Sequence, residues 1–125
     1  MKSNHLLKTG LYVLVLCVFI SCRKADASYI PDLGARWKDA SATVNDTYFF
    51  NPLYPSAKVS TFTGNEDLNF SDEYTFSGDY ENSKIQFTFT SGPKTGIKYS
   101  GTVSGTGNNS IITLHTPTGT IVLTR

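Results

Sequence analysis

The sequence predicts an all-β fold of about eight strands, from residue 34 to residue 125. β-branched and aromatic residues recur there in short runs, and no stretch keeps a 3.6-residue helical period. Stretches rich in glycine, proline, asparagine and aspartate separate these runs, as turns do between strands. The 125-residue length leaves room for one such domain.

The expected strands follow these runs in order. They span residues 35–44, 47–50, 57–63, 68–76, 84–91, 96–104, 110–116 and 120–125. The fourth strand continues through residues 78–80, beyond a kink at Gly78. The expected breaks are 51–56 with its two prolines, the polar turn "TGNED" at 63–67, "SGPKTG" at 91–96 and a tight hairpin at 117–119.

Alternating side chains predict which face of each strand is buried. In "KIQFTFT", Ile85, Phe87 and Phe89 share one face, and polar residues share the other. The same alternation places Ile97, Tyr99, Gly101 and Val103 together in the next strand, and Ile121 and Leu123 in the last one. One-sided strands fit a closed barrel or a sandwich better than a parallel sheet covered on both faces.

The first 21 residues have the layout of a signal peptide. Lys2 and Lys8 precede the uncharged run "GLYVLVLCVFI", and the chain then turns polar. That run is about half of the roughly 20 apolar residues that a membrane-spanning helix needs. We therefore expect residues 1–21 to be a cleaved signal rather than a transmembrane segment.

The junction "FISC" resembles the bacterial lipobox, in which an apolar pair and a small residue precede a cysteine that receives lipid. Phe19 and Ile20 form the apolar pair, Ser21 is the small residue, and Cys22 is the acceptor. The resemblance implies a lipid anchor at Cys22, which would hold the protein at the outer membrane. A disulfide between Cys17 and Cys22 would lose one partner with the signal, so we interpret Cys17 as an apolar residue of the signal.

Residues 22–33 are expected to form a tether between this anchor and the barrel. Surface export of such lipoproteins is associated with acidic residues soon after the lipidated cysteine. Arg23 and Lys24 come first here, which favours the periplasmic face of the outer membrane over the cell surface.

The segments "GARWK", "YTFSGDY", "KIQFTFTSG", "KYSGTVSG" and "TIVLTR" resemble, in order and spacing, the small lipocalin-like (calycin-type) lipoproteins of Bacteroidetes. The resemblance implies an antiparallel up-and-down barrel of about eight strands, whose first strand closes against its last. It also implies that an arginine near the end of the barrel, Arg125, covers a tryptophan of the first strand, Trp37. A guanidinium over an indole ring contributes about 0.5–2 kcal/mol.

Aromatic residues are the one enrichment with functional potential. We predict a ligand site for a small apolar molecule or a glycan, in which the candidate lining residues are Tyr48, Phe50, Tyr80, Phe87, Phe89 and Tyr99. Plain core filling is the competing interpretation, because an eight-stranded barrel is barely wide enough for its own side chains.

A second function class is a structural or protein-interaction lipoprotein of an envelope complex. It includes a role like that of the lysozyme inhibitors, because "SGPKTGIKY" is loosely similar to their Ser-Gly-x-x-Tyr loop. A binding module and an interaction protein therefore both stay open.

Other function classes find little support in the sequence. The processed chain keeps no thiol, and we expect no enzyme, no catalytic residue, no metal and no cofactor. A net charge of +1 gives no reason to expect nucleic acid as a partner. His115 is expected to be a partly exposed hairpin residue, and the acids Glu66, Asp67, Asp72, Glu73, Asp79 and Glu81 to lie in solvated loops.

Overall fold

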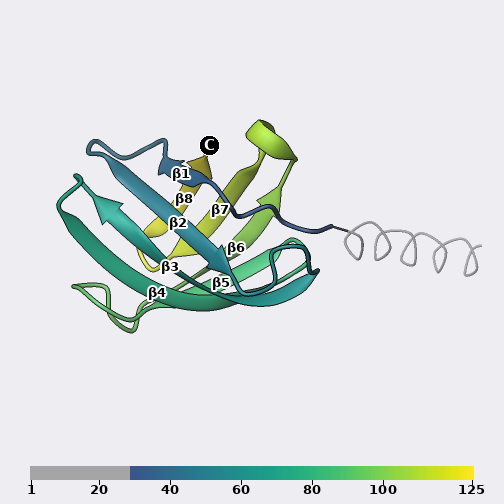
Figure 1. Ribbon diagram of the computed structural model, residues 1–125. Helices are drawn as coiled ribbons and strands as arrows, with labels where there is room; N and C mark the ends of the chain where they lie inside the picture. The colour runs from purple at the N-terminus through teal and green to yellow at the C-terminus, as the bar shows by residue number, and fades with distance from the viewer. Residues whose placement is uncertain (1–28) are drawn as a thin grey trace, which may run out of the picture.

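A computed structural model describes residues 29–125 of the chain. Its eight strands form one closed barrel, in which every strand is antiparallel to its neighbours and β8 returns to β1 (Figure 1). The predicted all-β, up-and-down, eight-stranded barrel is therefore confirmed. The expected signal peptide, Cys22 and the first part of the expected tether lie outside the described residues.

The strands follow one another around the barrel with short connections. Their bounds are β1 Arg36–Asp39, β2 Asp46–Pro52, β3 Val59–Leu68, β4 Asp72–Glu81, β5 Lys84–Phe89, β6 Lys98–Ser104, β7 Ile111–Thr116 and β8 Gly119–Thr124. A single turn of 3₁₀ helix, η1 Gly107–Asn109, lies between β6 and β7.

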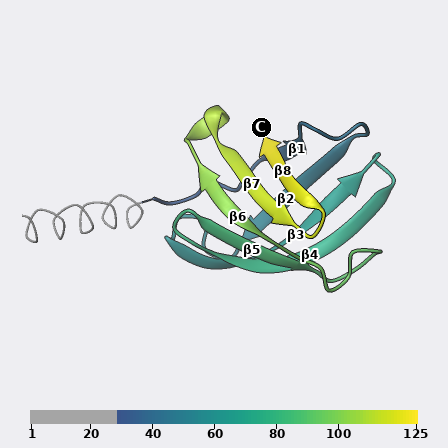
Figure 2. The same ribbon diagram turned by 180° about the vertical axis from the view of Figure 1, so that it is seen from behind.

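The up-and-down order gives the barrel two distinct ends (Figures 1 and 2). The end where the N-terminal segment enters is called the proximal end; its connections are residues 53–58, 82–83 and 105–110. The opposite end is called the distal end, and its connections are residues 40–45, 69–71, 90–97 and 117–118.

Two expected boundaries were wrong. The first strand ends at Asp39 instead of residue 44, because the Asp39 carboxylate accepts hydrogen bonds from the backbone N–H and the hydroxyl of Ser41 and so turns the chain. The expected turn at residues 63–67 belongs to β3, which pairs with both β2 and β4 through Leu68. The actual turn is at Asn69 and Phe70, both with positive φ.

The interior is filled mainly by aromatic and aliphatic side chains. Gly64 and Gly78 lie on the inward faces of β3 and β4, beside phenylalanine rings. A Cβ at Gly64 would come within 2.4 Å of the Phe76 ring, and one at Gly78 within 2.6 Å of Phe87. These two positions leave the space in which the rings pack.

The first described residues lie against the proximal end. Leu33 is buried in the core, and the Tyr29 hydroxyl donates a hydrogen bond to the carbonyl of Gly105 (3.0 Å). The Trp37 indole N–H donates to the Leu33 carbonyl (3.2 Å). The last part of the segment expected as a tether therefore closes the proximal end.

Candidate functional site

The six aromatic residues predicted to line a ligand site all lie in the interior, and all six are buried. The rings of all but Tyr80 contact one another or neighbouring phenylalanines, as between Phe87 and Tyr99 (centroids 5.5 Å apart) and between Phe89 and Tyr99 (5.2 Å). The closest ring pair is Phe76 and Phe87, at 4.3 Å. The structure thus brings these residues together as a continuous cluster of rings.

Tyr80 has a further contact outside this cluster. Its ring is buried, and its hydroxyl donates toward the carbonyls of Tyr54 and Ala57, each 3.0 Å away. Tyr80 therefore braces the 53–58 connection at the proximal end from within the barrel.

Trp37 and Arg125 meet at the proximal end. The Arg125 guanidinium lies 4.9 Å from the centroid of the fully buried Trp37 ring. It also donates to the carbonyl of Asp32 and forms an ion pair with the exposed Asp32 carboxylate (3.2 Å). One arginine thus joins the end of β8 to the first strand and to the entering segment.

A buried acid marks the distal half of the barrel. Glu66, on the inward face of β3, is only 1% exposed. The Lys94 ammonium binds both of its carboxylate oxygens (2.9 and 3.0 Å), and the Tyr48 hydroxyl donates to one of them (3.1 Å). The expectation that Glu66 lies in a solvated loop was wrong, because its partners come from β2 and from the 90–97 connection.

Lys94 lies across the rings at this end. Its ammonium is 5.2 Å from the Phe89 ring centroid and 5.6 Å from that of Tyr99. Burial lowers the pKa of Lys94, but hydrogen bonding to Glu66 and the charge of Glu66 raise it by more, so its pKa is above the ordinary value. The ammonium stays charged and holds the 90–97 connection over the barrel.

Asp46 lies beside Glu66 and is almost fully buried. Burial first, then hydrogen bonding to Glu66 and the negative charge of Glu66, raise the pKa of Asp46 to about 7. Its Oδ1 atom has no hydrogen-bond donor nearby. A protonated Asp46 resolves this, because its own O–H then donates to the Glu66 carboxylate.

These four residues, Asp46, Tyr48, Glu66 and Lys94, are called the distal polar cluster. An acid whose pKa is raised to about 7, beside a second acid, can hold and release a proton near neutral pH. Here Glu66 is already bound by Lys94 and Tyr48, so the cluster ties the distal connection to the barrel wall. Sequence reasoning predicted only Tyr48 among these residues, and for a different role.

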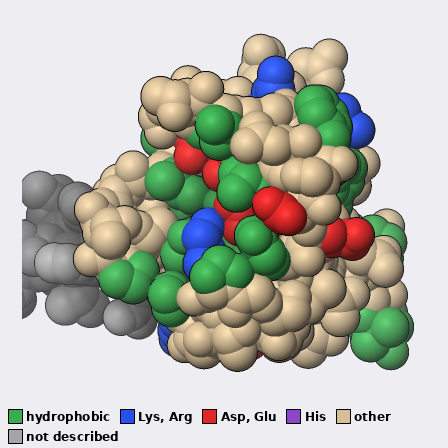
Figure 3. Space-filling model, turned by 90° about the vertical axis from the view of Figure 1, so that its left-hand side faces the viewer, with side chains coloured by type: hydrophobic (Ala, Val, Ile, Leu, Met, Phe, Trp, Pro, Cys, Tyr) green, Lys and Arg blue, Asp and Glu red, His purple; other side chains and the backbone are tan. Residues whose placement is uncertain are grey.

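The distal end also carries an exposed aromatic residue. Phe70 is 71% exposed in the β3–β4 turn, with φ +60°, a conformation that bulky residues rarely adopt. Viewed from this end, acidic and basic side chains gather among hydrophobic ones (Figure 3). The distal end therefore presents a mixed surface.

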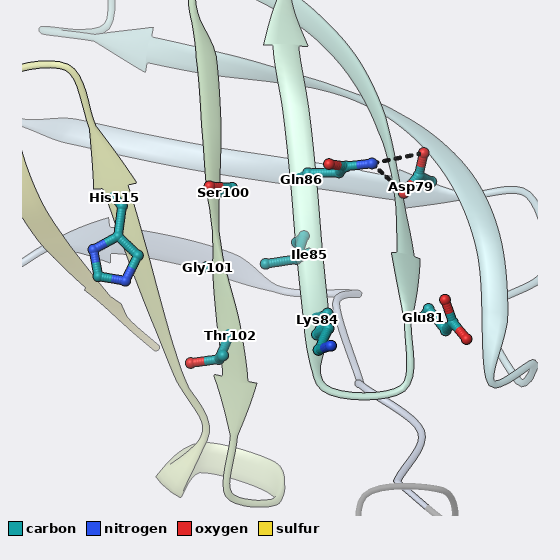
Figure 4. Close-up of a pocket in the computed structure, with 9 residues that line it drawn as sticks. All are labelled: Asp79, Glu81, Lys84, Ile85, Gln86, Ser100, Gly101, Thr102 and His115. Atoms are coloured by element: carbon teal, nitrogen blue, oxygen red, sulfur yellow. Dashed lines mark hydrogen bonds between the residues drawn. The ribbon is translucent and has the colours of Figure 1, made fainter.

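Open grooves occur on the outer wall of the barrel. One of about 440 Å³ crosses β4 to β7, with Asp79 and His115 on opposite sides of it (Figure 4). Gln86 donates to Asp79 (3.1 Å), while His115 faces the Thr120 hydroxyl of β8 (3.3 Å). None of the six predicted ligand residues lines this groove.

Comparisons of the chain with protein-family models, with curated proteins and with solved structures found no match. Within residues 29–125, no helix is long and apolar enough to cross a bilayer. In the same part of the chain, no three His, Cys, Asp or Glu side chains are grouped so that they could hold a metal ion.

Proposed function

We propose that this chain is a lipid-anchored, non-catalytic binding module of the bacterial cell envelope, which meets a partner protein with the distal end of a filled barrel. The filled interior is the observation that carries the proposal. An eight-stranded barrel has space for its own side chains and at most one small ligand. Here rings from five strands occupy that space in mutual contact.

The distal end offers the contact surface. Phe70 is held outward by a turn in which its backbone is strained, and large aromatic side chains are enriched where proteins bind one another. The Lys94 side chain, 32% exposed, lies at the same end of the barrel. An aromatic anchor together with charged groups around it is a typical core-and-rim combination of interfaces.

The lipobox ending at Cys22 supports the anchoring part of the proposal. Tyr29, the first described residue, lies at the proximal end, so an anchor seven residues upstream would leave the distal end facing away from the lipid. The periplasmic face of the outer membrane is the proposed location, because Arg23 and Lys24 follow Cys22.

A small polar ligand or a glycan is the second candidate for the distal end. The partly exposed Lys94 favours it, since ligand sites use a small number of placed charged groups. In this case the ligand would contact the rim of the barrel and leave the interior rings in place.

Native mass spectrometry of the protein purified from membranes tests whether the barrel encloses a small ligand or binds only at its surface. We expect the mass of a processed, acylated chain with no further small molecule. A molecule bound in a one-to-one ratio and released only on unfolding would contradict the proposal, because the barrel would then enclose a ligand.

Photo-crosslinking in the living cell tests the contact surface. A photoreactive amino acid replaces Phe70, and a matched variant carries it at Thr102, which is exposed on the outer face of β6. We expect a discrete crosslinked protein from position 70 and none from position 102. Equal patterns from both positions would show that the distal end has no special partner.

A further inference from the structure

The proximal end carries a second group of exposed apolar side chains, on the connection between β2 and β3. Leu53 is 64% exposed and Tyr54 is 62% exposed, and Val59 at the start of β3 is exposed beside them. These three residues are called the proximal apolar loop. Apolar side chains that are exposed together mark surfaces that contact a protein or a membrane.

The loop is held in shape from several sides. The Thr61 carbonyl accepts a hydrogen bond from the backbone N–H of Leu53 (3.0 Å). The Ser60 hydroxyl accepts one from the backbone N–H of Tyr54 (3.0 Å). The buried Tyr80 hydroxyl binds two carbonyls of the same connection. Because the backbone is fixed, the apolar side chains are presented outward in one arrangement.

The position of the N-terminal segment indicates what covers this loop. Tyr29 is fixed to Gly105, in a connection of the same end of the barrel. Cys22 lies seven residues before Tyr29, and seven extended residues reach about 25 Å at most. If Cys22 carries lipid, the proximal end therefore stays within that distance of the bilayer.

The charged side chains at the two ends also favour placing the proximal end at the bilayer. Lys58 and Lys84 are exposed at the proximal end, together with the acids Glu81 and Asp32. The distal end carries Asp67, Asp72 and Glu73 around the β3–β4 turn, and Lys94 and Lys98 in and after the 90–97 connection. Anionic lipid headgroups are attracted by exposed lysines and repelled by the acidic turn of the distal end.

We infer that the proximal apolar loop docks on the bilayer that holds the lipid anchor, with Leu53 and Tyr54 inserted at the headgroup level. Tyrosine suits this position because its ring is apolar and its hydroxyl stays hydrated. Docking fixes the barrel upright, so that the distal end points away from the membrane. The inference rests on the anchoring proposed above.

Tryptophan reporters in the acylated protein test the inference. The single native tryptophan, Trp37, is fully buried and supplies a constant background. Tyr54→Trp places a reporter in the proximal apolar loop, and Phe70→Trp places a similarly exposed one at the distal end. Each variant is reconstituted in phosphatidylethanolamine–phosphatidylglycerol vesicles, with or without bromine on the acyl chains.

We expect a blue shift and bromine quenching at position 54, and neither at position 70. Leu53→Trp is a second reporter in the loop if Tyr54→Trp disturbs the fold. Acylated protein without quenching at either loop position overturns docking and leaves the anchor intact, and equal quenching at 54 and 70 also overturns it. A chain whose mass shows no acylation refutes the anchor, and docking falls with it.

Discussion

At each end of the barrel, a cation lies over aromatic rings and pairs with an acid, but the two acids differ in burial. At the proximal end Arg125 lies over Trp37 and pairs with Asp32, and at the distal end Lys94 lies over Phe89 and Tyr99 and pairs with Glu66. Asp32 is largely exposed, whereas Glu66 is fully buried. The burial of the acid, rather than the contact of cation and ring, sets how much each end depends on its cation.

The physical reason is solvation. An exposed carboxylate that loses its partner is hydrated by water, so an exposed pair contributes at most about 1 kcal/mol. A buried carboxylate that loses its partner is left without solvent, which destabilises a protein by about 3–5 kcal/mol. The distal cation is therefore a structural requirement, and the proximal cation is a modest addition to a seam already closed by main-chain pairing.

Removal of Lys94 is expected to have the largest effect. Lys94→Met keeps most of the apolar stem but leaves Glu66 buried and unpaired, and we expect the free energy of unfolding at pH 8 to fall by about 3 kcal/mol. This value is at the low end of the range, because the Lys94 side chain is partly exposed. Urea unfolding followed by circular dichroism measures it.

A double variant shows whether the buried, unpaired charge of Glu66 causes this loss of stability. Adding Glu66→Gln to Lys94→Met removes the unpaired charge, so the double variant should recover much of the loss. Lys98→Met, at an exposed lysine of β6, serves as the control and should change stability by less than about 0.5 kcal/mol. A loss after Lys94→Met that persists unchanged in the double variant would show that packing matters instead.

Asp46→Asn is expected to have the next largest effect, and with opposite sign. The asparagine amide donates to Glu66 at every pH, whereas Asp46 can do so only while protonated. We expect the variant to be more stable than the wild-type protein at pH 8, by about 1 kcal/mol after allowance for screening. The wild-type protein is then the less stable one because two adjacent carboxylates are ionised.

The pH dependence follows from the raised pKa. The folded protein keeps the Asp46 proton up to about pH 7, and the unfolded chain releases it near the ordinary pKa of an aspartate, 3.8. The free energy of unfolding of the wild-type protein therefore falls as pH rises from about 4 to 7, relative to Asp46→Asn. Denaturant unfolding of both proteins at several pH values gives this difference, with the exposed Asp72→Asn as control. A constant difference across that interval would refute the shared proton.

The sequence predicted the parts of this comparison that depend on local patterns. Period-two alternation placed Phe87, Phe89 and Tyr99 on the inward face, and the structure has them there. The one-sided strands left a barrel and a sandwich open, and a resemblance in the order of the segments favoured the barrel. The alternation depends on neighbours along the chain, so a single sequence contains it.

The distal polar cluster depends on contacts that are distant in sequence. Glu66 lies 18 residues from Tyr48 and 28 residues from Lys94, and "TGNED" on its own is typical of a turn. One signal was available: the period-two pattern of Ser60 and Phe62, extended along the chain, places Glu66 on the inward face. A buried acid then requires a cation, and the 91–96 connection supplies Lys94.

Removal of the proximal cation, Arg125, is expected to have the smallest effect on stability. Arg125→Met should lower the free energy of unfolding by about 0.5 kcal/mol, because it removes the guanidinium from the Trp37 ring and leaves the solvated Asp32 behind. It should also change the emission of Trp37, the single tryptophan, which reports the contact directly.

Arg36→Met is the matched control, since Arg36 lies over the Phe49 ring on the outer wall, 5.4 Å from its centroid. It removes the same kind of contact without touching Trp37, so Trp37 emission should stay unchanged. If Arg125→Met lost as much stability as Lys94→Met, the proximal cation would be as essential as the distal one. Burial of the paired acid would then no longer explain the difference between the two ends.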